Sequence, residues 1–108
     1  MESLPVTEPV LLILLSLIEQ PRHGYAILQD VQEMSEGRVT LSTGTLYGAL
    51  RRLLDDGWIE RFEEERNSSR GRQAYRLTPG GRRHLQQKVS RLKQLTRVVS
   101  VRVVRKET

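Results

Sequence analysis

The fold is decided by residues 42–57, STGTLYGALRRLLDDG. At 3.6 residues per turn the leucines of this stretch form one apolar stripe, which predicts an amphipathic helix with that stripe on the protein core. We expect Ser42 or Thr43 to cap the helix, and we expect the helix to run to about Asp56 and end at Gly57. The stripe consists of Leu46, Leu50, Leu53 and Leu54.

The face opposite the leucines predicts a surface that enters a DNA major groove. It carries Thr45, Gly48 and Arg52, flanked by Gly44 and Arg51. A solvent-facing glycine costs a helix about 1 kcal/mol against alanine, but it lets the backbone approach DNA closely. Arg52 could reach a guanine edge with two hydrogen bonds and Arg51 a phosphate. Taken alone, the two arginines could equally be ordinary exposed charges paired with Asp55 and Asp56.

Polar side chains at the start of this helix and nearby are further candidates for DNA binding. The hydroxyls of Ser42, Thr43 and Thr45 lie beside free amides at the positive end of the helix, which favours a phosphate there. Tyr47 lies at the edge of the apolar stripe, and Tyr25 lies near the start of the preceding helix. Each tyrosine could pack in the core with its hydroxyl exposed or could reach a phosphate.

Two more helices are predicted upstream. The first begins near Thr7, its expected N-cap, and ends before Pro21. Its apolar run, residues 10–18, is far shorter than the roughly 20 residues that span a bilayer, so we expect a helix buried by protein and no membrane partner. The second helix is expected over residues 24–34, with Gly37 favouring its termination.

Downstream, the sequence predicts a β-hairpin and a long helix. Residues 58–63 and 73–78 are strand-like and flank a polar, basic loop, residues 66–72, whose Arg70 and Arg72 could touch DNA. Thr78 and the proline after it favour a helix start. We expect that helix to reach at least Arg97 and to continue through the β-branched end of the chain.

The fold class is therefore mainly α with a small β-hairpin, a winged helix-turn-helix with a long C-terminal dimerisation helix. We expect residues 1–78 to form the DNA-binding domain and residues 79–108 to form the dimerisation helix. Apolar residues on that last helix recur at coiled-coil spacing, which suits a second helix as partner. They are Leu85, Val89, Leu92, Leu95 and Val99.

Charge and composition narrow the function classes. The net charge is +5, distributed as −4 over residues 1–41, +1 over residues 42–78 and +8 over residues 79–108. The basic C-terminal segment is either a phosphate-facing surface or a solvated helix. There is no cysteine, which excludes disulfides and fits a cytoplasmic protein. No catalytic, metal-ligating or cofactor-binding constellation is recognisable, so we expect no enzyme, no metal and no cofactor.

Several segments resemble the PadR family of winged-helix transcriptional regulators, in its compact branch with a short last helix. They are residues 12–18, 21–28, 44–53, 57–59 and 75–81, with His-Gly-Tyr and Gly-Thr-Leu-Tyr the most specific elements. The resemblance implies a homodimer joined through the C-terminal helix and helped by the N-terminal one. It also implies operator binding, usually repression, with release by a small-molecule effector in many members.

Two departures from the family pattern limit what is carried over. Gly48 stands where proline is common in the family, and the wing end around residues 70–73 contains less proline. The last helix has no Phe, Tyr or Trp, so the stacking of planar effectors known in the family is not expected. We expect a roughly palindromic double-stranded operator. A winged-helix protein-interaction module and a non-specific architectural DNA-binding protein are the alternatives.

Overall fold

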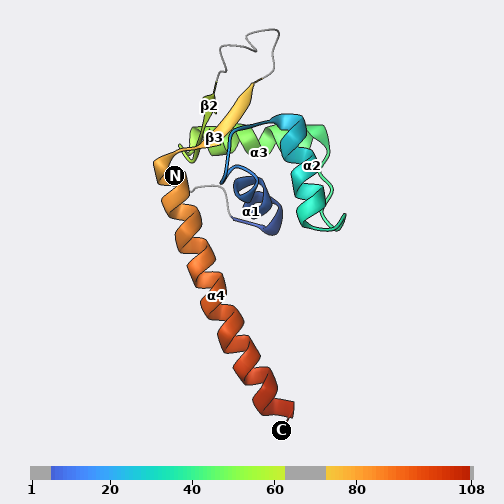
Figure 1. Cartoon of the computed structure of the whole chain (residues 1–108), viewed down its shortest axis with the longest axis vertical. Coiled ribbons are helices and arrows are strands. Elements are labelled where there is room, and N and C mark those ends of the chain that lie inside the picture. The colour runs from blue at the N-terminus through green and yellow to red at the C-terminus, as the bar shows by residue number, and fades with distance from the viewer. Residues whose placement is uncertain (1–5, 63–72, 108) are drawn as a thin grey trace.

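The computed structural model describes residues 6–62 and 73–107 and measures 61 × 30 × 25 Å. Figure 1 shows a body of three helices and a small sheet, from which one long helix projects. The elements in chain order are α1 (Glu8–Leu15), β1 (Arg22–His23), α2 (Gly24–Met34), α3 (Thr43–Asp55), β2 (Ile59–Phe62), β3 (Ala74–Leu77) and α4 (Pro79–Glu107). This is the predicted winged helix-turn-helix arrangement with a long last helix.

The core lies where α1, α2 and α3 meet beneath the sheet. Its largest fully buried side chains come from all three helices and from β2, and Leu85 of α4 joins the same cluster. On α3 the burial of Leu46, Leu50 and Leu53 confirms the predicted stripe, with Leu54 half-buried at its edge. Burying these leucines, at about 25 cal/mol per Å² of apolar area, fixes which side of α3 faces outward.

Local capping signals confirm most of the predicted helix boundaries. The Ser42 side chain accepts a hydrogen bond from the amide of Thr45 (3.1 Å) at the start of α3. Thr7 caps α1 in the same way, through the amide of Val10 (3.4 Å). The α1 helix ends at Leu15, and two tighter turns carry the chain on to residue 18. Gly37 and Gly57 have φ of +80° and +77°, the left-handed conformation that helix ends need and glycine adopts readily.

The sheet has three strands, in the order β1-β3-β2, so the predicted two-stranded hairpin was incomplete. The extra strand, β1, consists of Arg22 and His23, which pair with Tyr75 and Ala74 of β3. These residues were expected to be a plain connection, because two residues carry no strand periodicity. The pairing ties the start of α2 to the hairpin and therefore to α3.

The α4 helix is anchored tightly at its first turn. Thr78 accepts a hydrogen bond from the amide of Gly81 (2.9 Å) and donates one to the carbonyl of Gly57 (2.7 Å). The Cα of Gly81 packs so closely on Trp58 that a Cβ there would overlap the Trp58 carbonyl oxygen and lie 2.8 Å from its carbonyl carbon. Beyond this anchor α4 continues to Glu107, which confirms the expected helical end, and Figure 1 shows it extending away from α3.

Candidate nucleic-acid interface

The outward face of α3 is open, as the sequence predicts. A Cβ added at Gly44 or Gly48 would meet nothing within 4 Å, and the side chains of Thr45, Arg51 and Arg52 are exposed. Burial of the leucines on the opposite side forces this orientation. The exposed side of α3 has no side chain at its two glycines and carries the positive charge of Arg51 and Arg52 toward its C-terminal end. A single α-helix of this kind fits a major groove.

The N-terminus of α3 presents polar groups beside this exposed side. Ser42 accepts from the amide of Thr45 and donates to the Thr45 hydroxyl (2.9 Å). The amides of Thr43 and Gly44 come too early in the helix to pair with a carbonyl one turn before them. Ser42, Thr43, Gly44 and Thr45 are all exposed, so this end of α3 combines unpaired amides, hydroxyls and the positive end of the helix dipole.

Tyr47 connects α3 to the start of α2 and to the sheet. Its ring lies against Gly24, where a Cβ would overlap the Tyr47 hydroxyl and lie 2.8 Å from Cζ. Burial raises the pKa of Tyr75, the nearby Tyr47 raises it further, and the positive charge of Arg61 lowers it in part. Tyr47 is 42% exposed, so one side of its ring packs while the other remains in solvent. Tyr25 is 70% exposed and lies on the outside of α2.

The strands add basic residues that the sequence did not single out. Arg61 of β2 lies across from Tyr75 and donates to the side-chain oxygen of Gln73 (2.8 Å). Arg76 of β3 pairs with Glu60 (2.7 Å) and stacks over the ring of Phe62 at 4.9 Å. Because strand register is set by non-local pairing, no local pattern could place Arg61 beside the tyrosines. The predicted wing-tip residues Arg70 and Arg72 lie outside the described residues.

The predicted seam on α4 divides into two parts. Leu85 is 2% exposed and Val89 is half-buried, so both already pack within their own chain. Leu92, Leu95 and Val99 are 40%, 53% and 58% exposed and stand clear of the body. An apolar stripe this exposed is unusual for a monomer.

A family profile described as "Transcriptional regulator PadR-like family" matches residues 13–87, from α1 to the first turns of α4. The chain belongs to the PadR-like family. Family membership confirms the expectation that this is a transcriptional regulator and not an enzyme. In the described part of the chain no group of three His, Asp or Glu side chains could hold a metal ion. Likewise, no described helix is long and apolar enough to cross a membrane.

Solved PadR-like structures share the fold. A PadR family transcription regulator from Clostridium difficile R20291 superposes with a TM-score of 0.72 at 27% identity, covering 87% of this chain and 96% of that one. A transcriptional regulator from Clostridium thermocellum gives 0.68 at 30% identity, covering 83% and 84%. Bacillus subtilis PadR, solved in complex with operator DNA, gives 0.63 at 23% identity, covering 73% and 46%, and supports the fold alone.

Curated relatives include proteins without assigned function. An uncharacterized 37.1 kDa protein of transposon TN4556 in Streptomyces fradiae is 37% identical over 87 residues, which are 80% of this chain. The chain spans only 23% of the length of that relative. Protein X of Lysinibacillus sphaericus, also uncharacterized, is 24% identical over 90 residues, covering 83% of each chain.

Proposed function

We propose that this PadR-like regulator binds a specific operator in double-stranded DNA through α3. The observation that carries the proposal is the open face of α3, on which two glycines and two arginines point outward while the leucines are buried. Glycine at Gly44 and Gly48 has no packing reason in the free protein, since a Cβ would meet nothing at either position. Close approach of another molecule accounts for both.

In the proposed complex α3 lies in the major groove. Arg52 contacts a guanine edge and supplies sequence discrimination, while Arg51 contacts a phosphate. The exposed amides and hydroxyls at the start of α3 hold a second phosphate, and Tyr47 and Tyr25 border the same surface. Arg70 and Arg72 of the wing contact phosphates or the adjacent minor groove. Bacillus subtilis PadR, a protein of the same fold, is solved in complex with operator DNA, which supports DNA as the partner of this chain.

We further propose a homodimer that buries the exposed part of the α4 stripe. Leu92, Leu95 and Val99 form its centre, with Val89 at the inner edge, and Leu85 contributes mainly to the core of its own chain. Pairing two copies covers the apolar side chains that the single chain leaves in water. A two-fold dimer presents two α3 helices, so the operator is roughly palindromic, with half-sites about 34 Å apart.

The proposed regulator is a cytoplasmic repressor that a small-molecule effector releases from its operator. This part of the proposal follows from the family resemblance. Because α4 has no Phe, Tyr or Trp, the effector is not held by stacking between aromatic side chains of that helix. A thermal-shift screen of candidate ligands, followed by operator release, tests this part separately.

The main experiment compares arginine variants on selected and random duplexes. The operator is first isolated by selecting bound sequences from a genomic or random pool. Arg52→Ala should cost about 1–3 kcal/mol at one base pair and relax selectivity there. Arg51→Ala and Arg70→Ala should weaken all binding and lower the slope of log K against log salt by about 0.9 each. The matched control is Arg38→Ala, which removes a charge that is paired with Glu8 of α1.

The alternatives give different outcomes in the same titrations. A parent protein that binds no duplex would support the protein-interaction module. Binding without any preference for the selected sequence would support the architectural DNA-binding protein. Unchanged selectivity in Arg52→Ala, with Arg51→Ala also unchanged, would contradict docking through α3.

A further inference from the structure

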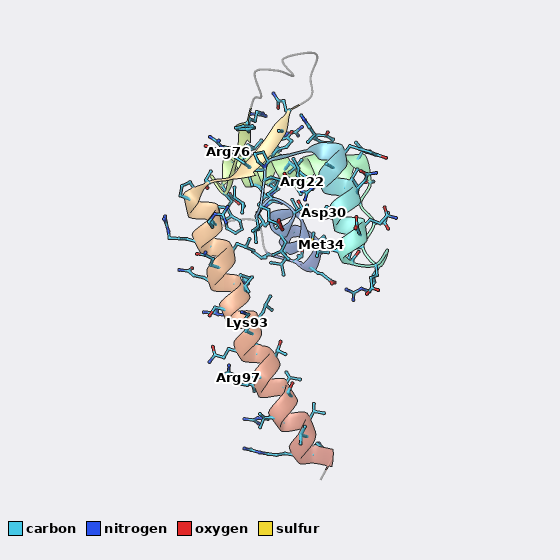
Figure 2. The ribbon with its side chains drawn as sticks, in the orientation of Figure 1. Arg22, Asp30, Met34, Arg76, Lys93 and Arg97 are labelled. Carbon is cyan, nitrogen blue, oxygen red and sulfur yellow. The ribbon has the colours of Figure 1, made fainter. Side chains whose placement is uncertain are left out.

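Half of the basic side chains of the chain lie on α4, away from the proposed operator-binding face. Residues 79–108 carry nine basic side chains and one acidic side chain. Figure 1 shows α4 leaving the body beside the sheet and running away from α3. Figure 2 places Lys93 and Arg97 on the part of α4 that stands clear of the body. Every described side chain from Ser90 to Lys106 is exposed. The operator bound at α3 is therefore out of reach of most of this charge.

The sequence of α4 itself is almost free of acidic residues. Salt bridges in the body of the protein join Arg22, Arg38 and Arg76 to acidic residues of other elements. Residues 79–106 contain no Asp or Glu. One-turn neighbours such as Lys93 and Arg97 therefore repel each other, which weakens an isolated helix. Binding of a polyanion would relieve this repulsion.

The polar side of α4 has the composition of a phosphate-binding surface. On the side of the helix away from the apolar stripe, a shallow open hollow is lined by Arg83, Gln86, Gln87, Ser90, Arg91 and Gln94. Arg97 continues the same side one turn later. We call these seven residues the outer face of α4. Arg, Gln and Ser are residue types that bond phosphate oxygens. No apolar side chain lies among these seven residues, and the exposed valines on this side of α4, beginning with Val98 and Val101, come after Arg97. The seven residues themselves therefore have nothing to insert into a lipid bilayer, which favours nucleic acid over a membrane.

We propose that the outer face of α4 binds the phosphate backbone of a second DNA duplex, distinct from the one at α3. The face extends from residue 83 to residue 97, about 21 Å along the helix, which is the length of about six base pairs. It lies opposite the apolar stripe, so a dimer joined through that stripe leaves both outer faces open. The inference rests on the proposed function only in that α3 holds the first duplex. A regulator built this way bridges two segments of DNA.

The test measures capture of a second duplex by the full-length protein. Immobilised operator duplex is saturated with protein, washed, and offered a labelled duplex without operator sequence over a range of salt concentrations. The outer-face variant is Arg83→Gln with Arg91→Gln and Arg97→Gln. Its matched control is Lys88→Gln with Lys93→Gln and Lys106→Gln, which removes the same charge from the borders of the apolar stripe. Circular dichroism and sedimentation verify that both variants keep the fold and oligomeric state of the parent.

The outer-face variant should keep operator selectivity but lose second-duplex binding more than tenfold. Its slope of log K against log salt should fall by about 2.7, since each phosphate contact contributes about 0.9. The control should retain most of the capture. Because the chain has no cysteine, a DNA-cleaving iron chelate can be attached at Ser90→Cys on the outer face or at Ser100→Cys near the stripe. The second duplex should be cut mainly from the first position.

Three results would overturn the proposal. They are a parent protein that captures no second duplex, an equal loss in both triple variants, and binding to vesicles rich in phosphatidylglycerol with no capture of DNA. The first result would mean that α4 is only a solvated helix. The second would mean that capture depends on net charge in general, and the third that the outer face binds a membrane surface. Failure of operator selectivity in the parent is a separate outcome. If binding to random duplex then still depends on the outer face, the proposed function fails and this inference stands.

Discussion

Gly48→Ala should stabilise the protein and weaken its binding to DNA. Gly48 lies inside α3, where a Cβ would meet nothing within 4 Å. Alanine is better than glycine in a helix interior by about 0.8–1.0 kcal/mol. No lost contact offsets that gain in the free protein. For a chain of this size, each kcal/mol of added stability raises the melting temperature by about 4 °C. The melting temperature of Gly48→Ala should therefore rise by about 3–4 °C.

The same methyl group should hinder docking, because it points from the side of α3 that faces the proposed groove. We expect the dissociation constant for operator to rise at least tenfold, which is about 1.4 kcal/mol. Melting is followed by calorimetry at one fixed protein concentration, since a dimer's midpoint depends on it. Operator binding is followed by fluorescence anisotropy.

Gly37→Ala is the matched control for this measurement. A Cβ at Gly37 also meets nothing within 4 Å, but the residue has a φ of +80°. Alanine is strained there by about 1–2 kcal/mol, so this variant should melt lower and bind DNA as the parent does. The reasoning is refuted if Gly48→Ala melts lower than the parent, which would mean hidden packing. It is also refuted if Gly48→Ala is stabilised yet binds operator unchanged.

Three further changes test how the site is held in place. Gly81→Ala should destabilise the fold by about 1–3 kcal/mol because its Cβ would overlap the Trp58 backbone. Gly80→Ala, with its nearest neighbours at 3.8 and 4.0 Å, should fit without such overlap, and urea unfolding compares the two. Ser42→Ala should lower the free energy of unfolding by about 1 kcal/mol through loss of the α3 cap, with Thr43→Ala as control, and equal effects would show that the Ser42 cap is unimportant. Tyr75→Phe tests the raised pKa of Tyr75. A raised pKa in the folded state gives stability that is present below the unfolded value, 10.0, and is lost as pH rises through the folded value. The parent should therefore lose more stability than Tyr75→Phe above about pH 10, and parallel curves would contradict the assignment.

The helices and the open face of α3 were predictable because their signals are local. The Ser42 cap and the leucine stripe fix where α3 begins and which side it buries, and the structure confirms both. The α2 helix also has the predicted bounds. In each case a few neighbouring residues determine the outcome, through hydrogen bonds within one turn and burial of one stripe.

Features that depend on distant pairing were not predictable. Strand β1 has two residues and exists only because β3 offers it an edge. The contact of Tyr47 with Gly24 depends on how α3 crosses α2, so the sequence left the role of Tyr47 open. The sequence already shows that the basic side chains gather near the C-terminus, but where they lie relative to α3 depends on the path of α4. Only the fold shows that α4 carries this charge away from α3.

The close packing of Gly81 on the Trp58 backbone makes the base of α4 a fixed pivot point. Since α4 has 29 residues, it is about 43 Å long, so a rotation of five degrees about its base moves its far end by about 4 Å. In the proposed dimer the angle between α4 and the rest of the chain sets the distance between the two α3 helices. We therefore expect the proposed dimer to bind operators of one half-site spacing more tightly than operators that are longer or shorter by one base pair.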